Sequence, residues 1–317
     1  MPGLKLAVVL NRRAGTLFGR SIEDGAREIE ARFARAGSSA SVTIEAGRAT
    51  IDAIRHAARS DAHVVVVGGG DGTVRSAARI VLEHGKTLGI LPLGTVNLLA
   101  RDLGIPFDLD AAIDALAAGE IRRIDVGVVN GRIFLSTSGL GFFVHMAQAR
   151  EEWRSSSMRS KWVAFAGALW TALARAPDFE IDIDTGDGLR AVRTRAVLTT
   201  NNIYEDVPGL VAKRPRLDRG ELALHIARHQ SRLATLRAAV LAINGGWQVD
   251  PGVETIRTRS FTVLSDRSHM RVSNDGELDV IKTPLLYRVR PRALAVLAPR
   301  AEDNPVRDRS GRNSRSD

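Results

Sequence analysis

The first part of the chain alternates between short apolar runs and segments with helical periodicity. The run Val64 to Val67 contains only β-branched residues, which is typical of a central strand buried on both faces. Apolar runs predict strands at 6–10, 42–44, 64–67 and 88–91, and apolar residues spaced three or four apart predict helices around 18–33, after Thr50, across 74–82 and after Asp108. Strands that alternate with helices indicate an α/β domain with a parallel sheet.

The pattern changes after Asp125. Asn130-Gly131 lies between two apolar runs and predicts a hairpin turn. A helical region rich in Ala and Trp is expected over 144–175, and short alternating runs predict strands at 179–183, 192–198, 222–226, 261–264 and 270–273. The second part is therefore expected to be a mainly antiparallel β-sandwich.

These patterns divide the chain into two domains and a tail. We expect an α/β nucleotide domain over 1–127, to which 285–299 returns, and a β-rich domain over 128–284. The segment 300–317 is polar, charged and almost free of apolar residues, so it is expected to be disordered.

Composition adds limits on the chemistry. The chain of 317 residues has no Cys, which excludes disulfides, thiolate metal sites and a cysteine nucleophile. Its formal net charge of +9 suits a polyanionic partner, such as a nucleotide, nucleic acid or an anionic membrane face. The N-terminus lacks a signal-peptide pattern, and no apolar stretch is long enough to cross a bilayer. We expect a cytoplasmic protein that could touch the inner face of the membrane.

The strongest local signal is a glycine-dense turn after the strand 64–67. Gly68-Gly69-Gly70-Asp71-Gly72-Thr73 connects this buried strand directly to a helix. Glycines let backbone N–H groups approach phosphate oxygens, and a helix N-terminus favours negative charge. The sequence fits neither the P-loop nor the dinucleotide-binding pattern. Asp71 could hold Mg²⁺ or its waters, or orient the loop.

Two more loops follow strands of the same predicted sheet. One runs from Pro92 to Arg101 and carries Gly94, Thr95 and Asn97. The other runs from Asn11 to Gly15 after the first strand. Ligands bind at the carboxyl ends of strands in open α/β sheets, so three such loops together indicate a phosphate site.

These motifs resemble those of the diacylglycerol kinase catalytic-domain family, which is related to sphingosine kinases and distantly to NAD kinases. The resemblance includes Gly69 to Thr73, 11–15, 92–101, 125–127 and 275–277, and it is greatest to the soluble bacterial lipid kinases. It implies an ATP- and Mg²⁺-dependent kinase that phosphorylates a lipid hydroxyl, with diacylglycerol as the leading acceptor. NAD kinases are not expected to carry the 94–101 loop in this form.

The resemblance also implies roles for individual residues. Glu277 matches the residue that takes the proton of the acceptor hydroxyl, with Asp275 beside it, and Asp71 and Asp125 are candidates for a metal-water network. The implied ATP-binding residues are Asn11, Gly15, Gly69, Gly70, Asp71, Gly72, Thr73, Gly94, Thr95 and Asn97. From the residues alone, 274–277 reads equally well as a turn between strands with two solvated acids.

Three departures from the family pattern affect these expectations. Arg12 stands where the family usually has Pro, and Leu98 stands where many members have Asp. The family's structural Mg²⁺ site corresponds to 217–222, where Arg219 replaces an acid and only Asp218 could substitute.

Other functions stay open on the sequence. The chain could be a lipid- or nucleotide-binding protein without turnover, or a kinase for sphingoid bases or for a soluble nucleotide such as NAD. A nucleic-acid partner rests on net charge alone and is not expected. The expected partner is a lipid at a membrane surface, for which a basic helical face carrying Trp153, Trp162 and Trp170 is a candidate. A homodimer also stays open on the sequence.

Overall fold

Contacts within the computed structural model divide the chain into two units. The structure describes residues 3–13, 22–154, 167, 170–171, 176–204, 214–228 and 252–300. Unit 1 comprises Met1–Ile124 and Ala293–Asp317, and unit 2 comprises Asp125–Arg292. The change of unit therefore falls slightly before the position 127 expected from the sequence. Asp125 opens unit 2, where the backbone amides of Gly220 and Arg292 bind its buried carboxylate.

Unit 1 is built on a parallel sheet with the strand order β2-β1-β3-β4. Its strands are β1 (Lys5–Asn11), β2 (Ser39–Glu45), β3 (Val64–Gly69) and β4 (Thr87–Pro92). Every residue of β3 and β4 is buried, as predicted for central strands. The far end of β16 (Leu285–Ala298) adds to this sheet, because Val296 pairs in parallel with Leu88 of β4.

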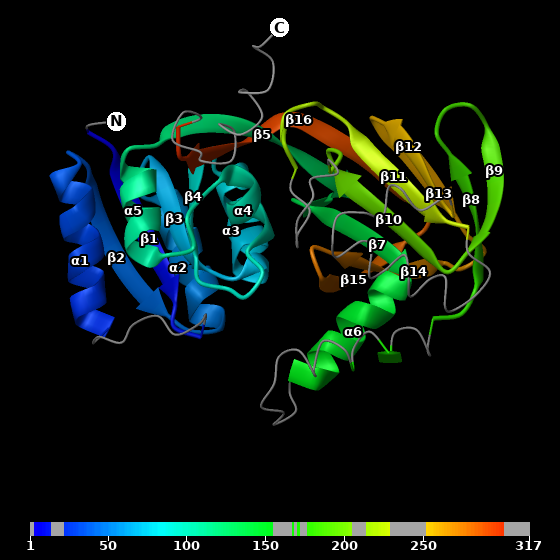
Figure 1. The fold of residues 1–317 in the computed structure, drawn as a ribbon, viewed down its shortest axis with the longest axis horizontal. Helices are drawn as coiled ribbons and strands as arrows, with labels where there is room; N and C mark the ends of the chain where they lie inside the picture. Colours follow the sequence, from blue (N-terminus) through cyan, green and yellow to red (C-terminus); the bar gives the residue numbers. More distant parts are fainter. Residues whose placement is uncertain are drawn as a thin grey trace, which may run out of the picture. The chain divides into compact units, whose positions relative to one another are not determined.

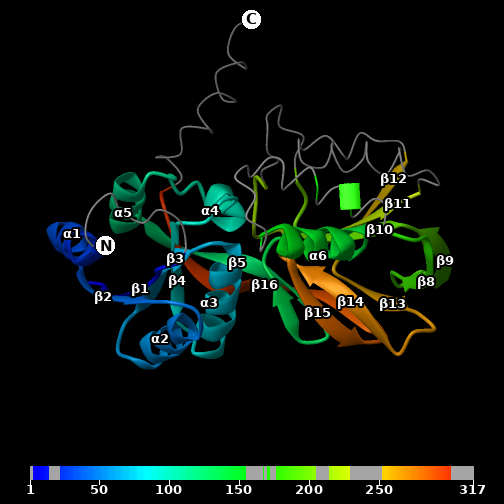
Figure 2. The ribbon, with the colours of Figure 1, turned by 90° about the horizontal axis from the view of Figure 1, so that it is seen from below.

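Helices cover both faces of this sheet (Figures 1 and 2). They are α1 (Ile22–Arg35), α2 (Arg48–Arg59), α3 (Asp71–Glu83), α4 (Leu98–Leu103) and α5 (Leu109–Ala117). In Figure 2, α1, α4 and α5 lie on one side of the strands and α2 and α3 on the other. Asp108 caps α5 as predicted, since its Oδ1 accepts from the amide of Ala111. The helix expected after Thr50 begins earlier than predicted, at Arg48 after Gly47, so Thr50 lies inside α2 and is not its cap.

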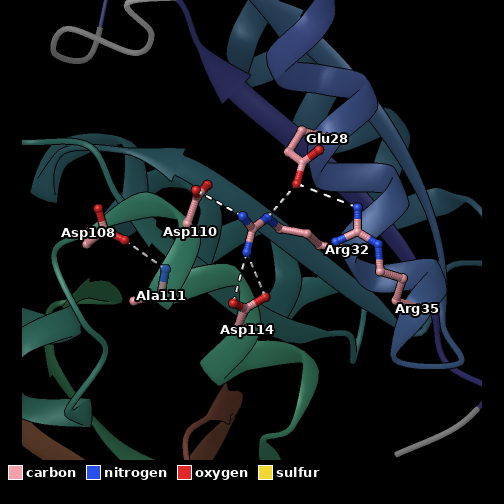
Figure 3. A network of polar contacts seen from close by, with 7 residues as sticks. All are labelled: Glu28, Arg32, Arg35, Asp108, Asp110, Ala111 and Asp114. Atoms are coloured by element: carbon pink, nitrogen blue, oxygen red, sulfur yellow. Dashed lines mark hydrogen bonds and ion pairs between the residues drawn. The ribbon is translucent and has the colours of Figure 1, made fainter.

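An ion-pair network joins α1 to α5 (Figure 3). Arg32 lies at its centre, with one guanidinium nitrogen 2.9 Å from Asp110 Oδ2 and another 2.9 Å from Asp114 Oδ2. Its Nε also donates to Glu28 of its own helix. The Asp114 carboxylate accepts a hydrogen bond from the Arg32 guanidinium, and this bond raises the pKa of Arg32. The network fixes the side-by-side packing of the two helices at one edge of the sheet.

Unit 2 contains two sheets with a shared apolar core. One is a six-stranded sheet of order β12-β11-β10-β7-β14-β15 in which all recorded pairs are antiparallel. Its strands are β7 (Thr137–Gly141), β10 (Ala196–Asn201), β11 (Leu222–Ala227), β12 (Val253–Thr258), β14 (His269–Asn274) and β15 (Glu277–Lys282).

The second set of strands is connected through β16, which pairs with both β13 and β5. It includes β5 (Glu120–Val129), β6 (Arg132–Phe134), β8 (Phe179–Asp184), β9 (Leu189–Thr194), β13 (Ser260–Leu264) and the first part of β16. Buried side chains of both sets, such as Leu224, Val272, Ile183 and Tyr287, form one cluster. This arrangement confirms the predicted antiparallel β-rich domain, and the Asn130-Gly131 turn between β5 and β6 forms as expected.

In unit 2, α6 (Phe142–Arg154) begins the region predicted to be helical. Of the predicted Trp-bearing face, Trp170 is exposed, whereas Trp162 lies outside the described residues, as does the tail 301–317 that is predicted to be disordered. Among the helices of the described residues, none combines the length and the apolarity needed to cross a bilayer.

Candidate active site

The glycine-dense turn connects β3 to the N-terminus of α3. Gly70 precedes the helix in extended conformation, and no side chain caps it. The first amides of an α-helix have no acceptor within the helix, and the helix dipole adds positive potential there. The glycines are required by space, because a Cβ on Gly69 would lie 2.6 Å from the Cβ of Thr73. The turn therefore has the shape and the donors of a phosphate cradle.

The loop after β4 lies directly against this turn. A Cβ on Gly94 would lie only 2.5 Å from Gly70 Cα, so the two glycines allow the backbones to touch. Asp71 joins the loops further: its Oδ2 accepts from the amide of Asn97 at 3.1 Å and its Oδ1 from the amide of Leu98 at 2.8 Å. Asp71 thus starts α4 and orients the second loop, which is one of the roles that the sequence suggested.

Asn97 shapes its own loop from within. Its backbone is left-handed, with φ at 53°, and its side chain is buried. Nδ2 donates to the carbonyl oxygens of Gly94 and Pro92, and Oδ1 accepts from the amide of Gly94. Thr95, at the tip of the loop, is exposed. Of these two polar side chains, only Thr95 is presented to solvent.

The loop after β1 completes the group. Asn11 Nδ2 donates to Thr73 Oγ1 at 3.2 Å, and Asn11 Oδ1 accepts from the amide of Arg13. This second bond closes an Asx turn, so the turn forms although Arg12 stands where the family has Pro. The structure therefore brings together all three loops that the sequence placed at one sheet edge. Gly15 lies outside the described residues.

The remaining acidic candidates belong to unit 2. Asp275 and Gly276 form a two-residue turn between β14 and β15, with φ at 50° and 82°. The Asp275 carboxylate accepts from the backbone amides of three successive residues, Leu135, Ser136 and Thr137, at 2.8–3.0 Å. The turn forms as the sequence alone suggested, but Asp275 is half-buried and bonded rather than solvated. Glu277 is exposed and begins β15.

An arginine that the sequence did not single out holds the same segment from its other side. Arg214 is almost fully buried, and its Nη1 donates to the carbonyl oxygens of Leu135 and Asn201 at 2.7 Å. Its Nη2 donates to Ser136 Oγ. Asp275 therefore binds the amides of this segment while Arg214 binds its carbonyl and hydroxyl oxygens. Nothing in the run 214–216 distinguishes this arginine from its basic neighbours.

Asp125 is fully buried, and each of its carboxylate oxygens accepts a backbone amide, from Gly220 at 2.6 Å and from Arg292 at 2.7 Å. A metal-bound water needs an accessible oxygen, and Asp125 presents none. Its contacts are those of a residue that fastens the 217–220 segment and β16 to the start of unit 2.

Asp218 is surrounded by cations. Arg216 donates to both of its oxygens, and a nitrogen of Arg292 lies 3.6 Å away. These arginines, Arg216 above all, lower the pKa of Asp218. Within the described residues, no group of three or more His, Asp or Glu side chains is placed to hold a metal ion. The residues at 217–222 therefore do not fit a structural Mg²⁺ site.

A cavity of about 600 Å³ lies elsewhere in unit 2, lined by residues of α6, β8 and β14 that include His145, Glu180 and Arg271. Neither Glu277 nor Asp275 borders it. It is therefore not part of the site described above.

Two family models match the chain and together span most of it. The diacylglycerol kinase catalytic domain matches residues 5–129, and the YegS C-terminal NAD kinase beta sandwich-like domain matches residues 143–298. The chain is also 27% identical to a diacylglycerol kinase of Staphylococcus saprophyticus over 85% of this chain and 88% of that protein. A diacylglycerol kinase of Staphylococcus haemolyticus is 26% identical over 95% of this chain and 92% of its own length.

Solved structures agree on the fold. A crystal structure of a diacylglycerol kinase from Bacillus anthracis strain Sterne superposes with a TM-score of 0.69 at 17% identity, covering 94% of this chain and 97% of that one. The order of the motifs, the three hydrogen-bonded loops and the family models that match the two halves all indicate the same kind of protein. Residues 5–129 therefore belong to the diacylglycerol kinase catalytic-domain family and residues 143–298 to the YegS C-terminal domain family, and the chain is similar over most of its length to bacterial diacylglycerol kinases.

Proposed function

We propose that the protein is an ATP- and Mg²⁺-dependent lipid kinase that transfers the γ-phosphoryl group to the hydroxyl of diacylglycerol and yields phosphatidic acid. The observation that carries this proposal is the set of three hydrogen-bonded loops around the uncapped N-terminus of α3. Backbone amides at a helix N-terminus bind phosphate without need for a particular base or sugar. The bacterial relatives that match 85% and 95% of this chain are named diacylglycerol kinases, which supports the acceptor.

In this proposal the backbone does most of the phosphate binding. The amides of Gly70 to Thr73 hold the phosphates, and the exposed hydroxyl of Thr95 adds a donor beside them. The chemistry that bound Mg²⁺ supplies is neutralisation of phosphate charge. Asp71 would meet the ion through water, because each of its oxygens already accepts an amide.

Glu277 is the proposed proton acceptor for the lipid hydroxyl. It is exposed at the first position of β15, next to a turn that Asp275 fastens with three hydrogen bonds. A carboxylate on a fixed turn can be held in line with an acceptor oxygen at little entropic cost. Asp275 therefore acts as a positioning residue in this scheme, and Arg214 supports the segment that Asp275 binds.

The test is phosphoryl transfer from radiolabelled ATP with Mg²⁺ to a panel of acceptors. Diacylglycerol, monoacylglycerol, ceramide and sphingosine are presented in detergent micelles, and NAD serves as a soluble acceptor. We expect labelled phosphatidic acid, with kcat lowered at least about a hundredfold in Glu277→Gln. Asp182→Asn, which changes an exposed carboxylate on β8, is the matched control and should keep full activity.

Each other outcome names a different function. Label on sphingosine or ceramide alone would change the acceptor, and label on NAD alone would indicate a nucleotide kinase. ATP binding without any labelled product would indicate a binding protein. Full activity of Glu277→Gln would remove this residue from the mechanism and leave the reaction in place.

A further inference from the structure

The outer face of β14 and β15 exposes apolar side chains in a row. Opposite residues of an antiparallel pair share one face, and Val272, Met270 and Ile281 place the inner face in the core. The outer face therefore carries Leu278 and Val280, of which 42% and 60% of the surface is exposed. The outer positions of the two strands, here called the β15 face, are His269, Arg271, Ser273, Leu278, Val280 and Lys282.

The neighbouring part of the same sheet is covered. Gly139 of β7 pairs with Ser273, and a Cβ on Gly139 would lie 2.4 Å from the Cβ of Phe143. Phe143 belongs to α6, which therefore packs on the sheet at β7. Figure 2 shows α6 running along this side of the sheet, with β14 and β15 beneath it. β15 is the last strand in the order of this sheet, and its outer side chains stay exposed.

The charges of the β15 face have one sign. Arg271 lies opposite Val280, and Lys282 lies opposite His269. Within these two fully described strands, no acidic residue occupies an outer position. Asp279, on the same strand, faces the other side and is bound by Arg132 and Asn274.

Adjacent leucine and valine side chains with flanking cations suit one kind of partner. Transfer of the apolar side chains from water to the acyl region of a bilayer is favourable, and each cation near an anionic bilayer adds electrostatic attraction. The net charge of +9 favours the same partner at longer range. A protein partner would need acidic side chains placed opposite Arg271 and Lys282, whereas an anionic bilayer presents negatively charged headgroups over its whole surface.

We infer that the β15 face docks the protein on the surface of an anionic lipid bilayer. Glu277 directly precedes Leu278 and its side chain lies on the opposite face of the strand, so docking of the β15 face holds the proposed proton acceptor close to the bilayer surface without burying it there. The inference deepens the proposed function and rests on it for the role of Glu277. The contact with the bilayer itself can be measured without any turnover.

The experiment is sedimentation of the full chain with vesicles of phosphatidylcholine alone or mixed with phosphatidylglycerol. We expect binding to the mixed vesicles that weakens as salt is added. The double variant Arg271→Gln, Lys282→Gln should bind about thirtyfold more weakly, as follows from the attraction of each basic residue to an anionic surface. Leu278→Ser with Val280→Ser should also lose binding, and this loss should not depend on salt.

Matched controls lie on other strands of unit 2. Leu189 is an exposed leucine of β9, and Arg257 is an exposed arginine of β12. Leu189→Ser and Arg257→Gln should bind the vesicles as the wild type does. Equal binding by the wild type and both double variants, or no preference for the anionic vesicles, would overturn the inference. So would a dimer in light scattering that Leu278→Ser with Val280→Ser dissociates, since the face would then join two copies.

Kinase assays separate this inference from the proposed function. With diacylglycerol in detergent micelles, the double variants should keep wild-type kcat, and with diacylglycerol in the mixed vesicles their rates should fall with their binding. Vesicle binding that depends on the β15 face, in a protein that phosphorylates no lipid, would sustain the docking surface and refute the kinase. Lipid kinase activity that the double variants retain equally on vesicles and on micelles would support the kinase and refute the docking surface.

Discussion

At the scale of single residues, the proposed phosphate site depends on glycines whose missing side chains let two loops touch. Gly94 is the sharpest case, because a Cβ on it would lie only 2.5 Å from Gly70 Cα. Gly94→Ala should force the loops apart, destabilise unit 1 by about 1–3 kcal/mol and weaken ATP binding at least about tenfold. Thermal unfolding and calorimetric titration with ATP measure the two effects.

Gly85→Ala is the control for this substitution. A Cβ there meets nothing within 4 Å, yet its φ of 65° makes alanine unfavourable by about 1–2 kcal/mol. The two variants should therefore lose similar stability, and only Gly94→Ala should lose affinity for ATP. Unchanged affinity in Gly94→Ala would show that ATP binding does not need the contact between the loops.

At the scale of elements, the stretch 217–222, where a structural Mg²⁺ was considered, has arginines beside its only candidate ligand, Asp218. Arg216 and Arg292 neutralise Asp218, so unit 2 should not need a divalent ion to fold. We expect EDTA to leave the midpoint of thermal unfolding unchanged, and added Mg²⁺ without nucleotide to leave it unchanged too. A lower midpoint in EDTA would contradict this reading of the loop.

A variant without these arginines should, by the same reasoning, become sensitive to Mg²⁺. Arg216→Gln with Arg292→Gln removes both cations from Asp218 while the amide of residue 292 can still bind Asp125. The loss in stability should be small, because exposed ion pairs contribute about 0–1 kcal/mol. Added Mg²⁺ should then raise the unfolding midpoint of the variant more than that of the wild type.

The elements that the sequence predicted are those with a local cause. β3 is a run of buried valines, and α5 has its cap at Asp108. Others depend on distant residues. α4 is a six-residue helix that begins where Asp71, from another loop, accepts its first amides. β7 reads Thr-Ser-Gly-Leu-Gly and becomes a strand because β10 and β14 pair with its two edges.

The site divides in the same way. Glycine spacing and strand ends predicted the three phosphate loops, because chain direction alone brings them to one edge of a parallel sheet. The hydrogen bonds that Asp275 accepts from the amides of Leu135 to Thr137 join residues about 140 positions apart in the sequence. No periodicity or turn signal extends over such a distance, so the sequence could not predict them. Arg214 was missed for this reason too.

At the scale of the whole molecule, stability should depend on pH through a histidine in the core of unit 2. His225 lies on β11 with its Nδ1 2.9 Å from Thr255 Oγ1 and is almost fully buried. Burial lowers its pKa well below the usual value of 6.5. The unfolded chain therefore binds a proton that the folded chain does not, and stability falls as pH drops below about 6.5, by up to about 1.4 kcal/mol per pH unit.

Glu254 adds a second dependence at lower pH. Arg190 and Arg228 lower its pKa to about 2 from 4.5, so the stabilisation is present above 4.5 and is lost as pH falls toward 2. Urea unfolding at a series of pH values should therefore show a decline that begins at the histidine and steepens at the glutamate. His225→Leu should remove only the first part, and His56→Gln, which changes an exposed histidine of α2, should alter neither. A decline that persists unchanged in His225→Leu would assign it to another group.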